Sequence, residues 1–323
     1  MLERTTFSRL HPIERSFSMF FQSRFIKGML CLCLLFPFVA EAKLKVVTTI
    51  ADLAAIAQEV GGDKIEVTSL ARGTQDPHFI DPKPSMVLQL NKADVLIEVG
   101  TSLEIGWLPT LIQNSRNSQI LTGASGRITA SERIHLLEIP TAKVDRSMGD
   151  VHPEGNPHYS LDPRNGLIIA EQIAERLEAL DPGNAEMYVQ NLNRFRQNLT
   201  AKIESWETRM SPYRDRKIVT YHKQWLYLSD WLGLSEINYV EDKPGIPPSP
   251  KHIESLIQQM RAEQVQVLLN SNLISPAVAE RVASQGGAKL VVLPIAVGGE
   301  KDIKTYADLF ESIVSKLEAA FKE

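Results

Sequence analysis

The sequence predicts an α/β protein of two lobes, each with a mostly parallel sheet flanked by helices, joined by one long rigid helix. Short β-branched runs alternate with longer amphipathic stretches in two separate series, a pattern typical of parallel sheets with crossover helices. The roughly 280 residues that follow residue 42 exceed the usual size of a single core. We therefore expect an N-terminal lobe at residues 43–180, a linking helix at 181–211 and a C-terminal lobe at 212–323.

The two series predict elements of the same kind. In the first, strands are expected at residues 44–50, 65–70 and 95–99, and helices at 53–60, which Gly61 ends, and 83–92, which Pro84 opens. In the second, strands are expected at residues 217–221, 236–240, 265–270 and 288–293, and helices at 224–232, 250–263 and 275–285. This similarity indicates two α/β lobes rather than one sheet interrupted by a long excursion.

The linking helix has the clearest local pattern in the chain. Asp181-Pro182 supplies an N-cap and a first-turn proline, with Glu186 placed to complement the helix dipole. Apolar residues then recur at spacings of mostly three and four until Ser211-Pro212. The pattern predicts one amphipathic helix of about 30 residues, roughly 45 Å long at 1.5 Å per residue.

Residues 1–42 resemble a targeting segment. Five basic residues precede an apolar run at 29–40, which ends in the cleavage pattern Ala40-Glu41-Ala42. The run is shorter than the roughly 20 residues that cross a bilayer. We expect cleavage after Ala42 and export to the periplasm, and an internal start at Met19 would give a more conventional signal.

Cysteine usage and charge narrow the class of protein. The two cysteines, Cys31 and Cys33, fall inside the targeting segment and outside any lipoprotein-like box of small residues. The predicted mature chain therefore has no thiol, which excludes disulfides, cysteine nucleophiles and Cys-based zinc sites and suits an oxidising compartment. The predicted mature chain contains 30 Lys and Arg and 36 Asp and Glu, and it has no block of basic residues. We therefore expect no nucleic-acid partner. We expect a monomer.

Three histidines lie far apart in the sequence, in loops or at a strand end: Asp76-Pro77-His78, Asn156-Pro157-His158 and Thr220-Tyr221-His222. Imidazole suits zinc, copper, iron and nickel, and three such groups could clasp one ion once the chain folds. His222 follows an apolar strand, where open α/β sheets bind their ligands. Taken singly, a loop histidine is more commonly a solvated residue, and His222 could be a packing residue.

The other histidines after residue 42 carry weaker signals. His252 is expected at the surface at the start of a helix, and His135 is expected to be structural, in an apolar strand. His152 belongs to a Gly/Pro-rich loop six residues before His158, where it could capture an ion first or cover the site. Asp162 and Pro163 could open a helix, and the Asp162 carboxylate could accept a hydrogen bond from a ligating imidazole.

Read together, these motifs resemble the zinc/manganese solute-binding proteins that feed bacterial ABC importers, the ZnuA/TroA-type family. The resemblance covers residues 43–323. Its motifs are Gly-Thr-x-Asp-Pro-His at 73–78, Pro-His-x-x-Leu-Asp-Pro at 157–163, the long helix, Tyr221-His222 leading to Tyr227-Leu228, the Pro-rich run at 244–250, and Thr305-Tyr306-Ala307-Asp308-Leu309-Phe310. The resemblance implies one metal ion between two lobes, with His78, His158 and His222 as ligands.

The fourth ligand is where the chain departs from the family pattern. The family commonly has an aspartate immediately before Ser/Thr-Tyr, and this chain has Lys304 there. We predict Asp302 as the fourth ligand, with Glu300 or a water as the alternatives. Three imidazoles and at most one carboxylate favour Zn²⁺ over Mn²⁺, the second choice. Because neutral imidazole is the ligating form, affinity should fall as the pH drops through about 6.5.

The predicted function is capture of a divalent metal ion in the periplasm and delivery to an inner-membrane ABC permease. This role needs no bond chemistry, so the chain is not expected to be an enzyme. A zinc-dependent hydrolase is the main alternative, since three histidines with an open position can also activate water. However, the sequence has no His-Glu-x-x-His pair and no Gly-x-Ser-x-Gly element. A metal-binding adhesin on the same fold is the third possibility.

Overall fold

The computed structural model describes residues 42–322, so the predicted targeting segment lies, apart from Ala42, outside the described residues. No helix in the described part is both long and apolar enough to cross a bilayer. Residues 43–323 form one compact unit by their internal contacts. The predicted boundaries within that unit, near residues 180 and 211, stay predictions.

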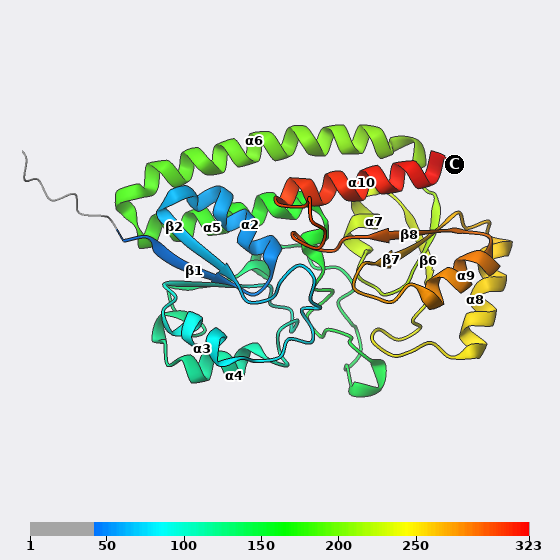
Figure 1. The fold of residues 1–323 in the computed structure, drawn as a ribbon, viewed down its shortest axis with the longest axis horizontal. Coiled ribbons are helices and arrows are strands. Elements are labelled where there is room, and N and C mark those ends of the chain that lie inside the picture. The colour runs from blue at the N-terminus through cyan, green and yellow to red at the C-terminus, as the bar shows by residue number, and fades with distance from the viewer. Residues whose placement is uncertain (1–41, 323) are drawn as a thin grey trace, which may run out of the picture. The chain divides into compact units, whose positions relative to one another are not determined.

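Two four-stranded parallel sheets organise this unit, which confirms the predicted fold class (Figure 1). The first sheet has the order β2-β1-β3-β4 and the second the order β6-β5-β7-β8, so both follow one scheme. The strands are β1 (Leu44–Thr48), β2 (Ile65–Ser69), β3 (Val95–Glu98), β4 (Arg127–Thr129), β5 (Lys217–Thr220), β6 (Ser235–Tyr239), β7 (Val267–Ser271) and β8 (Lys289–Leu293). We call residues 43–180 the first half and residues 212–322 the second half.

The helices cover both faces of each sheet. They are α2 (Ala51–Gly61), α3 (Pro84–Asn91), α4 (Leu108–Ser115), α5 (Pro163–Leu180), α6 (Ala185–Met210), α7 (Leu226–Leu232), α8 (Pro250–Ala262), α9 (Ala277–Gly286) and α10 (Tyr306–Lys322). The N-terminus of α5 agrees with the sequence pattern, because Asp162 caps it and Pro163 is its first residue. Three of these elements, β4, α4 and α10, were not predicted from the sequence.

One predicted element is wrong. His135, expected in an apolar strand, lies exposed in an irregular segment after a short 3₁₀ turn at Ala130–Arg133. The apolar run around His135 resembles a strand, but the first sheet ends at β4, a few residues earlier. With no neighbouring strand to pair with, this run stays irregular.

The long helix α6 lies over elements of both halves (Figure 1). Its 26 residues, about 39 Å at the usual rise, are flanked by 3₁₀ turns at Pro182–Asn184 and Ser211–Tyr213, so the α-helix is shorter than predicted. Near its start, Asn191 donates a hydrogen bond to the carbonyl of Val60 in α2. Near its end, the Trp206 indole donates to Glu311 in α10.

Side chains along each strand point alternately to the two faces of the sheet. The apolar residues therefore divide between one buried cluster shared by both halves and two private clusters, each confined to one half. Val46 and Ile218, in the central strands β1 and β5, belong to one continuous buried cluster that also contains Trp206 of α6. Their neighbours Val47 and Val219 point the other way, each into a cluster confined to its own half. The two halves are therefore joined by a common core and not only by a linking helix.

Candidate metal centre

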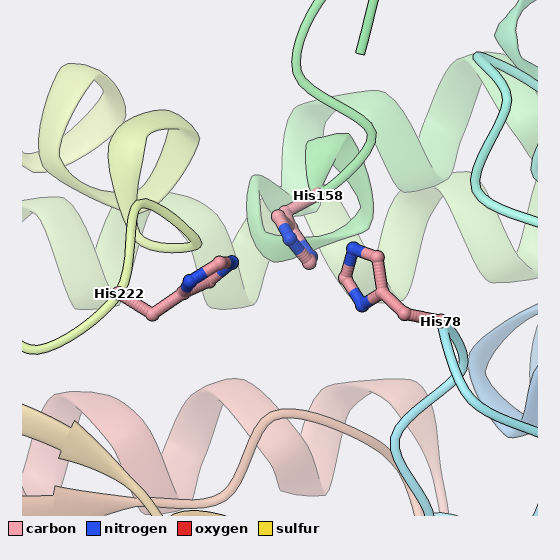
Figure 2. Close-up of side chains that lie close together, drawn as sticks. All are labelled: His78, His158 and His222. Atoms are coloured by element: carbon pink, nitrogen blue, oxygen red, sulfur yellow. The ribbon is translucent and has the colours of Figure 1, made fainter. Parts of the chain in front are cut away.

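His78, His158 and His222 come together although they are far apart in the sequence. Each offers one nitrogen, and these three atoms all lie within 4.8 Å of one another. The ring centroids are 5.3 Å apart for His78 and His158, 5.8 Å for His158 and His222, and 6.1 Å for His78 and His222. Figure 2 shows the three side chains approaching one another from three separate segments.

His78 is held by a stiff loop that follows β2. Pro77 fixes the backbone before it, and the Pro77 carbonyl accepts a hydrogen bond of 2.9 Å from the indole of Trp107. The Asp76 carboxylate accepts from the His78 amide at 3.0 Å and lies 2.8 Å from His78 Nδ1. Burial opposes ionisation of Asp76, but the hydrogen bonds from His78 hold the pKa of this carboxyl below its ordinary value.

His158 sits at the turn that leads into α5. Its amide donates to the Asn156 side chain at 3.0 Å, and Asn156 in turn donates to the carbonyl of Lys223 in the second half at 2.8 Å. Burial lowers the pKa of His158 well below its ordinary value, which favours the neutral imidazole that metals bind. Asp162 caps α5, as expected, and its carboxylate bonds Arg164 rather than the His158 imidazole.

His222 lies two residues beyond the end of β5, at the carboxyl edge of the second sheet. Its Nδ1 is 2.9 Å from Glu241 Oε2, and that oxygen also accepts from the Gly245 amide at 2.9 Å. Glu241 follows β6, the neighbour of β5, so both side chains emerge at one edge. A carboxylate on Nδ1 fixes the tautomer that leaves Nε2 free to bind a metal, as Asp76 does for His78.

The two carboxylates considered from sequence for the fourth position do not belong to the histidine group. Asp302 is exposed in a turn of the second half, and Glu300 forms an ion pair with Lys316. A different residue comes close: His152 Nε2 is 3.3 Å from His78 Nε2. Desolvation, with the neighbouring His78, lowers the pKa of His152 to about 4.

Asp76 and Glu241, which bond the imidazoles of His78 and His222, were not predicted from the sequence. Asp76 could have been found from its place two residues before His78, where a carboxylate commonly bonds the backbone and side chain that follow. Glu241 could have been found from its place just beyond the strand next to β5.

Two cavities flank the histidines. One, of about 360 Å³, extends from His158 and His222 to residues of a loop that includes His152 and to Pro244. The other, of about 220 Å³, lies between the same two histidines and a wall of the second half that includes Leu273, Ile274 and Ile295. Part of the wall around the three converging imidazoles is therefore apolar, which suits a partly dehydrated borderline-soft metal ion.

Comparisons with known proteins identify the class. A family model described as zinc-uptake complex component A, periplasmic, matches residues 46–320, and it defines a substrate-binding component of a metal ABC transporter. The chain belongs to this family, called ZnuA. Proteins of this class bind metal ions and work with a membrane permease.

The matching relatives are named for different metals. The manganese ABC transporter substrate-binding lipoprotein PsaA of Streptococcus pneumoniae is 27% identical over 274 residues, covering 82% of this chain and 85% of the relative. The iron-binding protein YfeA of Yersinia pestis is 27% identical over 288 residues, covering 86% of each. These names do not decide which metal this chain binds.

Solved structures share the fold. A crystal structure of ZnuA has a TM-score of 0.72 at 23% identity, covering 86% of this chain and 98% of that one. The Mn-bound periplasmic metal-binding protein of Candidatus Liberibacter asiaticus has a TM-score of 0.71 at 24% identity, covering 86% and 99%. At this identity the likeness concerns the fold alone.

Proposed function

We propose that this protein captures Zn²⁺ in the periplasm with His78, His158 and His222 and delivers it to the inner-membrane permease of an ABC importer. The observation that carries the proposal is the convergence of three imidazoles from both halves, with two of them oriented by carboxylates. Export by cleavage after Ala42 is part of the same proposal.

Zinc is preferred to manganese on the chemistry of the donors. The group of possible ligands among the described residues contains three histidines and no carboxylate. Zn²⁺ binds imidazole nitrogen strongly, whereas Mn²⁺ is better served by oxygen. Mn²⁺ stays the second candidate because a relative is named for manganese.

The hydrolase alternative lacks support from the site. A catalytic zinc needs a general base beside its bound water. The acidic residues considered for that role are the exposed Asp302 and Glu300, which pairs with Lys316. Binding without bond chemistry is the simpler use of this arrangement.

Metal titration of the purified protein tests the proposal. After removal of metal by a chelator, calorimetry should show one tight Zn²⁺ site with weaker Mn²⁺ binding. His158→Ala and His222→Ala should each weaken zinc binding by more than about a hundredfold, since even outer partners of a ligand are worth 10–100-fold. Zinc at a thousandfold excess over Kd should stabilise the wild type by about 4 kcal/mol.

His135→Ala is the matched control, because this histidine is exposed and outside the group. It should bind zinc as the wild type does. A wild-type thermal melt that zinc leaves unchanged would sink the proposal, and equal losses in all three variants would show that the histidines act non-specifically.

A further inference from the structure

A loop of the first half crosses to the second half beside the histidines. We call residues 145–155 the strap. On the second half, the Asp150 amide donates to the carbonyl of Pro244 at 2.8 Å, and Lys243 Nζ donates to the carbonyl of Ser147 at 2.9 Å. On the first half, the Ser102 hydroxyl donates to Glu154 at 2.7 Å. The strap is therefore tied to both sides of the candidate site.

The closeness of this crossing depends on a glycine. Gly149 has a φ of +80°, and a Cβ at this position would lie 2.2 Å from the Pro244 carbonyl oxygen. Only glycine adopts this conformation freely and allows the backbones to approach so closely. The strap is thus built to lie against the loop that follows β6.

The strap places His152 against His78. The distance between the two Nε2 atoms is 3.3 Å. Two nitrogens bound to one tetrahedral zinc at 2.0–2.1 Å lie about 3.3–3.4 Å apart, so this spacing suits ligands of a single ion. The backbone of Thr101 lies beside the His152 ring, the kind of outer contact that orients a ligating imidazole.

Thr101 belongs to an unusual turn after β3. Gly100, Thr101 and Ser102 all have positive φ, of 79°, 51° and 58°. For threonine and serine this conformation costs free energy and is kept where the surroundings demand it. Here the turn holds the strap through the hydrogen bond from Ser102 to Glu154, and Thr101 lies beside His152.

Three carboxylates near or predicted for the site have different partners or positions. Asp76 and Glu241 bond the Nδ1 atoms of His78 and His222. Asp302 is exposed and lies outside the histidine group. The wall of the second half that lines the smaller cavity includes Ile295, whose apolar side chain cannot bind a metal ion. His152 is the imidazole that remains among the residues lining the two cavities.

We propose that His152, carried by the strap, is the fourth ligand of the bound zinc, which completes a site of four imidazoles. This inference rests on the proposed function. His152 is not within 4.8 Å of all three other ligand atoms, so the strap shifts toward His158 and His222 when it binds the ion. The strap then covers the ion and links its capture to the contacts at Pro244.

X-ray absorption spectroscopy of the zinc-loaded wild type tests this proposal directly. The scattering from the atoms bound to zinc, and from the outer atoms of the imidazole rings, gives the number of bound histidines. We expect four imidazoles. His152→Ala should leave three imidazoles and one oxygen, weaken zinc binding at least tenfold, and change the visible spectrum of the cobalt-loaded protein. His135→Ala, the control, should keep four imidazoles and wild-type affinity.

The outcomes separate this inference from the proposed function. Three imidazoles and an oxygen in the wild type, with unchanged affinity in His152→Ala, would overturn the role of His152 and leave zinc capture intact. A wild type that binds no zinc would overturn both. The wild-type measurement decides the question even where His152→Ala folds poorly.

Discussion

The two halves use one sheet order but place their proposed metal ligands in different ways. In the second half, His222 stands two residues beyond the central strand β5, and Glu241 stands beside it beyond β6. In the first half, His78 and His158 lie in proline-containing loops well beyond β2 and β4. A strand end positions a ligand through the sheet itself, whereas a loop needs proline and side-chain hydrogen bonds to do the same.

The largest expected effect breaks the core that the halves share. Trp206 is 1% exposed and packs against Trp231 and Phe310, with ring centroids 6.2 and 5.7 Å away. Trp206→Ala should lower the free energy of unfolding by about 3–5 kcal/mol, measured by urea denaturation. Hydrogen exchange should rise in both halves, because the lost contacts belong to the common cluster.

Trp107→Ala is the matched control, since Trp107 is equally buried but lies in the private cluster of the first half. It should cost a similar free energy and raise exchange in the first half alone. Identical exchange patterns in the two variants would contradict a shared core.

The next effect concerns a buried carboxyl that joins the halves. Asp52 accepts from the Val297 amide at 2.7 Å and from the Ser160 hydroxyl at 3.1 Å, and burial raises its pKa from 3.8 to about 6. The folded state therefore binds more protons than the unfolded state between pH 4 and 6, so this group's contribution falls as the pH rises. Asp52→Asn, which does not titrate, should gain up to about 3 kcal/mol on the wild type across that range.

Urea denaturation of the metal-free wild type and variant at pH 4, 5, 6 and 7 measures this difference. Taking the difference removes the opposing contribution of His152 and His158, whose lowered pKa values favour folding as the pH rises. A difference that stays flat with pH would show that Asp52 does not titrate in this way.

A smaller effect is expected for the two carboxylates that bond the proposed ligands His78 and His222. Asp76→Asn and Glu241→Gln should each weaken zinc binding by about 10–100-fold, because each carboxylate orients an imidazole and raises its basicity. Calorimetry at pH 7 would measure both. If only Asp76→Asn mattered, the strand end alone would suffice to orient His222.

The smallest effect concerns an ion pair at the rim between the halves. Lys223 Nζ lies 3.0 Å from Glu138, and both side chains are about one third exposed. Water screens such a pair, so Glu138→Gln should cost less than about 1 kcal/mol in stability. A loss larger than that of Trp206→Ala would mean that polar rim contacts, and not the common core, join the halves.

Much of the fold was predictable because its strands are β-branched runs of four or five residues with clear breaks. β4 was missed because it has only three residues, too few for a periodic signal. The second series was predicted except for α10, since each of its four strands has four or five residues.

The site was predicted in part. The contexts of His78, His158 and His222 indicated a common site, and the structure brings these side chains together, although metal binding itself stays a proposal. Asp302 was predicted because it lies two residues before Lys304, which occupies the aspartate position of the family pattern. In the structure, the Gly298 amide donates to the Ile303 carbonyl and closes a turn. The buried Ile303 points inward and its neighbour Asp302 outward, a consequence of tertiary packing that the sequence does not show.

The helix α6 has a consequence for how long the protein retains a bound metal ion. Helix α6 and the buried cluster beneath it contact both halves. Moving the two halves far apart would therefore expose Trp206 and its neighbours to water, at a cost of several kcal/mol. Spontaneous unloading by a clamshell motion is therefore rare. We expect a long residence time in the free protein, with departure of the ion governed by loop movements that docking on the membrane complex provokes.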